Sequence, residues 1–398
     1  MKRWSTAIRS AGEPAAAMVL FAGLALTISF TLIPPEKALN VAYVPARDDV
    51  VLEKVPVRAR AAPGVELSEQ AAAQRARELI TQARARGGDP RLLGQAQAVL
   101  SKWWSSQDAS SELLLMRATV KQSLHDFDGA LADLDLVVGR DPHRPAGEPA
   151  DSVDPQAWLT RATVLTVQGR YADAVASCQH LNASERVLET MVCVAIPEAL
   201  QGKLSESRAK LSELVVNEPA SKAWVSSVRG ELERWAGDDV AAEKSLREAV
   251  MLDAGDSYSR SLLAELLLDL GRPKEVVALY AGRELNDTEL LWVVLANPED
   301  AARKEELAAR VAANRQRGET LHRREESRYA LRVEGDAEMA LTLAVENWKV
   351  QREPADARVF IEAAVAAHRS VALEPVRAWL NETKLPWPVL HKLLEQTP

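Results

Sequence analysis

Apolar residues recur at helical spacing along most of the chain, in short segments separated by polar breaks. From residue 69 onward, glycines mark four of these breaks. Gly169, Gly202, Gly237 and Gly271 are separated by 33, 35 and 34 residues. An apolar-periodic segment such as AWLTRATVLTVQ precedes each glycine, and a second one such as GRYADAVASCQHL follows it. A regular period of this kind predicts a repeat of helix, tight turn and helix.

The same pattern extends in both directions from these glycines. Residues 69–104 read as a first helix pair, and Gly335 begins another second helix, with room for one degenerate pair before it. Segments 355–370 and 373–383 read as a final pair. The pattern predicts an all-α fold for residues 69–398, a right-handed α-solenoid of about eight helix pairs. Residues 140–155 carry four prolines and are expected to form a surface loop.

Particular residue types recur at fixed places in these units. A large residue opens the first helix, small residues lie where the two helices meet, and several units end in proline. In one unit the corresponding residues are Trp158, Ala162, Gly169, Tyr171 and Ala174. The units over residues 110–285 resemble the tetratricopeptide repeat (TPR) family, in its bacterial exported or membrane-anchored type. The resemblance implies a scaffold without catalytic activity that binds a peptide or helix in a concave groove.

In this frame the groove would be lined by inward positions of the first helices. The candidate residues are Leu115, Thr119, Gln122, Leu159, Thr163 and Thr166. These side chains are apolar or neutral, which suits an apolar helix or an extended segment of a protein partner. The family's lysine and asparagine clamp for a terminal carboxylate has no counterpart among them. Occupation of the groove by the chain's own proline-rich spacer is the alternative.

The stretch LHDFDGALADLDLVVGRDP, residues 124–142, raises the question of a metal site. As the second helix of a pair, it would bury its apolar residues and expose Asp128, Asp133 and Asp135 along a solvated edge. His125 then occupies the turn position that glycine takes in later units. The alternative is a weak surface cation site formed by His125, Asp126 and Asp128, as a metal-handling accessory would need.

An uncharged segment precedes the repeats. Residues 15–33 are long enough to cross a bilayer as a helix, and the basic residues in 1–14 before them predict a cytoplasmic N-terminus. Residues 34–68 read as a proline-rich spacer, so the repeat domain at 69–398 is expected in the periplasm, anchored to the inner membrane. The alternative is a cleaved signal segment and secretion to the periplasm.

Composition narrows the functional classes. The net charge of −8 gives no electrostatic reason to bind nucleic acid. No nucleotide-binding, hydrolase or metalloprotease motif occurs, so neither an enzyme, a cofactor, a bound metal nor a small-molecule substrate is expected. Cys178 and Cys193 are read as two small buried residues, although they could pair in an oxidising compartment. The pattern favours a protein-binding scaffold or adaptor at the bacterial envelope over a metal-handling accessory or an envelope glycan-binding protein.

Overall fold

The computed structural model describes residues 67–85, 88–139, 153–181, 186–316, 318 and 322–396. By its internal contacts the chain divides into two units, Met1–Gly64 and Val65–Pro398, and the described residues belong to the second. The predicted cytoplasmic segment at 1–14, membrane segment at 15–33 and nearly all of the spacer at 34–68 therefore lie outside the described residues, as do residues 140–152 of the proline-rich loop.

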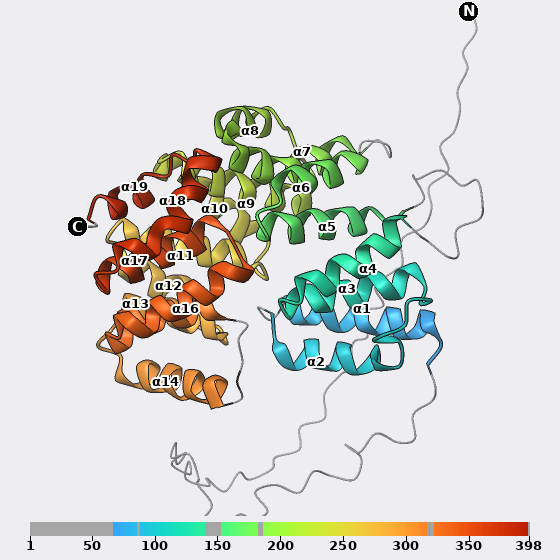
Figure 1. The fold of residues 1–398 in the computed structure, drawn as a ribbon, viewed down its shortest axis with the longest axis horizontal. Coiled ribbons are helices and arrows are strands. Elements are labelled where there is room, and N and C mark those ends of the chain that lie inside the picture. The colour runs from blue at the N-terminus through green and yellow to red at the C-terminus, as the bar shows by residue number, and fades with distance from the viewer. Residues whose placement is uncertain are drawn as a thin grey trace, which may run out of the picture. The chain divides into compact units, whose positions relative to one another are not determined.

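The described part of the chain is built from helices and contains no strand. Most of the helices follow one another as pairs, as the sequence predicts (Figure 1). Their bounds are α1 Glu69–Ala85, α2 Pro90–Val99, α3 Ser111–Ser123, α4 Phe127–Gly139, α5 Pro155–Val167, α6 Tyr171–Gln179, α7 Val187–Glu198, α8 Leu204–Ser212, α9 Pro219–Trp235, α10 Asp239–Leu252, α11 Ser257–Asp269, α12 Pro273–Leu279, α13 Asp287–Ala296, α14 Ala301–Gln316, α15 Arg323–Tyr329, α16 Ala337–Val350, α17 Pro354–Ala366, α18 Glu374–Thr383 and α19 Pro388–Leu394.

Local sequence signals set where many of these helices begin. Asp154 caps α5 by accepting a hydrogen bond from the backbone N–H of Gln156, and Pro155 occupies the first helical position. Proline fits there because its missing N–H would have no partner inside the helix. Asn286 and Glu289 form a reciprocal capping box at the start of α13. These caps satisfy backbone donors that the first turn of a helix leaves free.

The turn inside most pairs depends on one residue in the left-handed backbone conformation. Gly169, Gly237, Gly271 and Gly335 have φ values of 79°, 76°, 69° and 73°. Glycine adopts this conformation without the steric cost of a Cβ atom. His125 stands at the same place between α3 and α4 with a φ of 57°, so the prediction that it replaces the turn glycine is confirmed.

Three apolar clusters form the core. The first joins α1 to α6 and extends to α7, and the third joins residues of α10 to α15. The second combines residues of α6–α9 with Ala330 and residues of α16–α19, which lie far apart in the sequence. The chain is therefore more than a row of pairs that contact only their neighbours, because its C-terminal helices return to pack on the middle of the array.

Specific contacts fix this return of the C-terminal helices. The backbone N–H of Arg352 donates to the carbonyl of Val167 at 2.8 Å. The indole N–H of Trp379 donates to the Tyr171 hydroxyl at 2.7 Å, and that hydroxyl donates to the Arg352 carbonyl at 3.2 Å. Because Tyr171 is buried, these bonds hold α18 and the start of α17 against the α5–α6 turn.

The solvated edge of α4 is only partly as predicted. Asp128 and Asp135 are exposed, as expected, but Asp133 is 3% exposed. Its carboxylate contacts the Arg117 guanidinium at 2.5 Å and the Lys121 ammonium at 2.9 Å. The prediction of an exposed Asp133 is wrong because α3 carries two cations that a helix-by-helix pattern cannot place opposite it.

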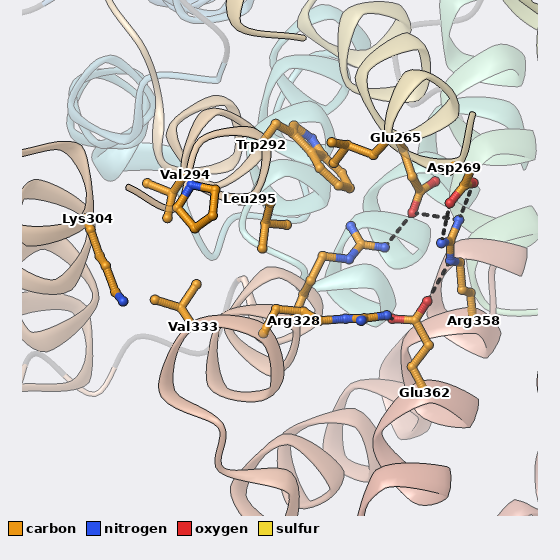
Figure 2. Close-up of a pocket in the computed structure, with 13 residues that line it drawn as sticks. Glu265, Asp269, Trp292, Val294, Leu295, Lys304, Arg328, Val333, Arg358 and Glu362 are labelled. Atoms are coloured by element: carbon orange, nitrogen blue, oxygen red, sulfur yellow. Dashed lines mark hydrogen bonds and ion pairs between the residues drawn. The ribbon is translucent and has the colours of Figure 1, made fainter. Parts of the chain in front are cut away.

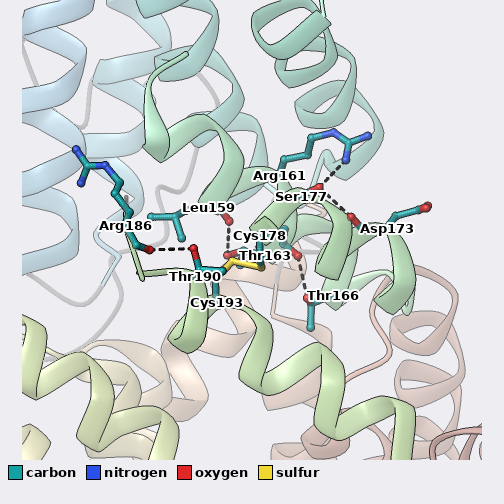
Figure 3. Close-up of a disulfide and its surroundings, with 11 residues drawn as sticks. Leu159, Arg161, Thr163, Thr166, Asp173, Ser177, Cys178, Arg186, Thr190 and Cys193 are labelled. Carbon is teal, nitrogen blue, oxygen red and sulfur yellow. Dashed lines mark hydrogen bonds between the residues drawn. A yellow bond between two sulfur atoms is a disulfide. The ribbon is translucent and has the colours of Figure 1, made fainter. Parts of the chain in front are cut away.

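The two cysteines form a disulfide between α6 and α7. The Cα atoms of Cys178 and Cys193 lie 5.6 Å apart, and their sulfur atoms are bonded (Figure 3). The preferred interpretation of two separate buried thiols is therefore wrong. The two helices pack directly against each other, which brings Cys178, near the end of α6, opposite Cys193 in the middle of α7.

No helix in the described part of the chain combines the length and apolar character that a bilayer crossing requires.

Candidate functional site

The predicted groove residues do not form one open surface. Leu115 and Thr119 are buried, at 1% and 5% exposure, within the core that α3 shares with its neighbours. Gln122, Leu159 and Thr166 are half-buried, and Thr163 is exposed. Three of the hydroxyls donate to carbonyls of their own helix, such as Thr119 to Leu115 at 2.8 Å.

Leu159, Thr163 and Thr166 lie on α5 beside the disulfide (Figure 3). Leu115 and Thr119 are too deeply buried to contact a partner directly. A partner surface at the remaining four residues stays a prediction.

The residues of the possible cation site are engaged separately. Nδ1 of His125 lies 3.2 Å from Nε2 of Gln351, and its ring stacks on Phe127. Asp126 accepts the backbone N–H of Gly129, and Asp128 accepts Nε2 of Gln168. Among the described residues, no group of three or more histidine, cysteine, aspartate or glutamate side chains is arranged to hold a metal ion.

A cavity of about 400 Å³ lies in the C-terminal half of the described array (Figure 2). Many of its walls come from the first helices of successive pairs: α11, α13 and α15, together with α17. The residues that line it are Glu265, Leu268, Asp269, Trp292, Val294, Leu295, Pro298, Lys304, Arg328, Arg332, Val333, Arg358 and Glu362. The cavity therefore lies mainly on first helices of pairs, as the repeat pattern predicts. It does not lie on α3 and α5, where the groove was expected.

Glu265 is the centre of the ionic network on one wall of this cavity. One carboxylate oxygen accepts from Arg234 at 2.6 Å, and the other accepts from Arg328 at 2.6 Å. A third guanidinium, that of Arg358, lies 3.6 Å away. Burial acts to raise the pKa of Glu265, but Arg234, Arg358 and Arg328 outweigh it and hold the pKa well below its ordinary value. Glu265 is therefore ionised in the folded chain.

Two further carboxylates extend the network. Asp269 contacts Arg358 through two bonds of 2.7 Å and also accepts from Arg234 at 2.8 Å. Glu362 accepts from Arg358 at 2.9 Å and pairs with Arg332 at 3.2 Å. These bonds link α9, α11, α15 and α17, so the network fixes the geometry of the wall as well as its charge.

The opposite wall is apolar. Figure 2 shows Val294, Leu295 and Val333 across the open space from the charged side chains, with Lys304 at the edge. The Trp292 ring lies between the two walls, and the Arg328 guanidinium stacks over it at 4.5 Å. This stacking holds a planar cation against an aromatic face. A cavity with one charged and one apolar wall suits a ligand that carries both kinds of group.

A smaller cavity of about 80 Å³ adjoins the first and shares Glu265, Trp292 and Arg328 with it. Here Glu231 on α9 accepts the Tyr258 hydroxyl of α11 at 2.8 Å. Desolvation raises the pKa of Glu231 to about 7, although the hydrogen bond from Tyr258 opposes the rise.

One feature of the sequence indicated this site, although it is not part of the repeat pattern. Glu265 interrupts an apolar run, LLAELLLDL at residues 262–270, in the first helix of its pair. A charged residue at a buried helix position requires a charged partner. The partners Arg328 and Arg358 are more than sixty residues away in the sequence, which no local pattern reveals.

No family model and no curated protein sequence matches the chain. Among solved structures the chain is similar to the crystal structure of the TPR domain of P58(IPK), at 15% identity and a TM-score of 0.24. The match covers 81% of this chain and 98% of that one. The helix bounds and the contacts between successive helices show the array of helix pairs without this match.

Proposed function

We propose that this chain is a non-catalytic scaffold or adaptor that binds another protein through the first-helix face of its repeats. The observation that carries the proposal is the cavity on α11, α13, α15 and α17, where one wall is ionic and the other is apolar. Helix-pair arrays commonly bind partners on the surface that their first helices share. The ionic network holds this wall in place before a partner arrives, which lowers the entropic cost of binding.

The proposal extends to location. The basic residues before residues 15–33 favour an inner-membrane anchor with the repeat domain in the periplasm. The disulfide between Cys178 and Cys193 supports an oxidising compartment, because structural disulfides are rare in the reducing cytosol. A reporter active only in the cytoplasm, fused after residue 398, should be silent in cells. A strong reporter signal would contradict this location.

Binding through the cavity can be tested by photocrosslinking in intact cells. A benzophenone amino acid at Lys304, an exposed residue at the edge of the cavity, should give a discrete crosslinked product. The same amino acid at Val240 on α10, which is 85% exposed and outside the cavity, should not give that product. Equal products from both positions, or none from Lys304, would argue against a partner at this face.

A further inference from the structure

The cavity has more cationic than anionic groups. Four cations line it, namely Lys304, Arg328, Arg332 and Arg358, against the three carboxylates Glu265, Asp269 and Glu362. Outside the lining, Arg234 bonds to Glu265 and Asp269 from α9, and the Glu325 carboxylate acts on Arg328, so the lining groups keep an excess of one cation. Each carboxylate is already shared by at least two guanidinium groups. Every carboxylate of the network therefore has its cationic partners, and the groups that line the cavity retain a net positive charge.

The excess charge lies where a ligand can reach it. The Arg332 side chain is 51% exposed, and its partner Glu362 is also bonded to Arg358. Lys304 is exposed and forms no ion pair with any described carboxylate. Arg328, by contrast, is 7% exposed, and burial lowers its pKa, against the opposing effect of Glu265. An added anion would stabilise the charged form of this buried guanidinium.

We propose that the cavity binds an acidic side chain of a partner protein together with an adjacent apolar side chain of the same segment. The carboxylate would lie beside Arg328 and Arg332, and the apolar side chain would pack against Val294, Leu295 and Val333. This inference rests on the proposed function and adds the chemistry of the partner.

The size and chemistry of the site agree with a peptide segment. Its volume of about 400 Å³ accommodates a few side chains and falls within the range of roughly 300–1,000 Å³ of ligand sites. Guanidinium groups bind carboxylates through paired, charge-assisted hydrogen bonds, and removal of water from the apolar wall strengthens such bonds. A basic side chain would meet uncompensated positive charge at the same place, which is unfavourable.

The test is selection from a random peptide display library with the purified full-length protein. The parent protein should enrich peptides in which Asp or Glu is adjacent to Leu, Ile, Val or Phe. The variant Arg332→Glu should lose these peptides, with binding at least tenfold weaker for a selected sequence. Arg303→Glu is the matched control, because Arg303 is next to Lys304 on α14 but does not line the cavity.

The possible outcomes separate the two proposals. Enrichment of basic peptides, or of acidic peptides that both variants bind equally well, would overturn the inference but leave a protein-binding scaffold. If no peptide is enriched, both proposals fail. A charge-swapped peptide, with Lys in place of the acid, should bind Arg332→Glu better than it binds the parent. Circular dichroism and the melting temperature of each variant show whether a loss of binding comes from unfolding.

Discussion

At the scale of single residues, the buried carboxylate of Asp133 stabilises the first half of the array. It pairs with both Arg117 and Lys121, and the Arg117 side chain also donates to backbone carbonyls of Trp103 and Ser106. Removing one member of a buried pair leaves an uncompensated charge. Asp133→Ala should therefore lower the free energy of unfolding by about 3–5 kcal/mol.

The control for Asp133 lies two residues further along the same helix. Asp135 pairs with Arg161, but its side chain is 59% exposed. Exposed pairs contribute less than about 1 kcal/mol, so Asp135→Ala should be almost neutral. Denaturant unfolding measures both. Equal effects of the two changes would contradict the buried position of Asp133.

A second residue, His125, should make stability depend on pH. Its pKa is lowered from 6.5 to about 4, first by burial and then by the neighbouring His322, with Arg324 acting in the same direction and Glu325 opposing. The folded chain binds this proton less tightly than the unfolded chain does. The stability contributed by neutral His125 is therefore complete above about pH 6.5 and is lost as the pH falls toward 4.

The variant His125→Asn tests this pH dependence. Asparagine tolerates the left-handed backbone that His125 adopts, and it cannot be protonated. The fall in melting temperature between pH 6.5 and 4 should be smaller in this variant than in the parent. His368→Asn is the matched control, since His368 has a φ of 55° but is exposed. An unchanged pH profile in His125→Asn would contradict the assignment.

At the scale of helices, the register of the repeat depends on small residues where paired helices meet. Ala174 on α6 and Ala162 on α5 are buried in the same cluster, at 0% and 3% exposure. Ala174→Leu should destabilise the fold by about 1–3 kcal/mol, because a closely packed crossing has no space for three more carbon atoms. Asp173→Ala, an exposed position on the same helix, should be nearly neutral. Equal melting temperatures for the two variants would show that the register is wrong.

One of the C-terminal helices, α19, also packs closely against a turn between paired helices. A Cβ atom at Gly237 would lie 2.8 Å from Cγ of Pro388, whereas one at Gly271 would have no neighbour within 4 Å. Both residues have a positive φ, which costs a non-glycine residue about 1–2 kcal/mol. Gly237→Ala should therefore be more destabilising than Gly271→Ala, as measured by thermal melts. Equal losses would mean that α19 does not pack against this turn.

At the scale of the whole chain, the sequence predicted the helix pairs, which depend on short segments. It did not predict the contacts between residues that are far apart in the sequence. The positions of Gly169, Gly202, Gly237 and Gly271 predicted the successive helix pairs, because the left-handed turn and the apolar period are properties of short segments. The packing of Trp379 on Tyr171 joins residues 208 apart in the sequence. The repeat period does not predict this contact, because the contact depends on how distant helix pairs pack against one another.

The difference between local and distant contacts also explains why the candidate site lies elsewhere than the sequence predicted. The groove was predicted on α3 and α5 from the register of the first helices, yet Leu115 is buried there. The cavity on α11 to α17 depends on Glu265 meeting Arg328 and Arg358 from other pairs. A charged residue inside an apolar run was the available signal, and it indicates a buried ionic partner without saying which one.

The central claim is that a partner protein binds in the charged cavity through an acidic segment. The most direct test combines the photocrosslinker at Lys304 with the change Arg332→Glu in intact cells. Because Arg332 is half-exposed and Glu362 keeps Arg358 as a partner, the variant should fold normally. The crosslinked product should be lost in this variant and retained in Arg303→Glu. Undiminished crosslinking in a folded Arg332→Glu protein would contradict it.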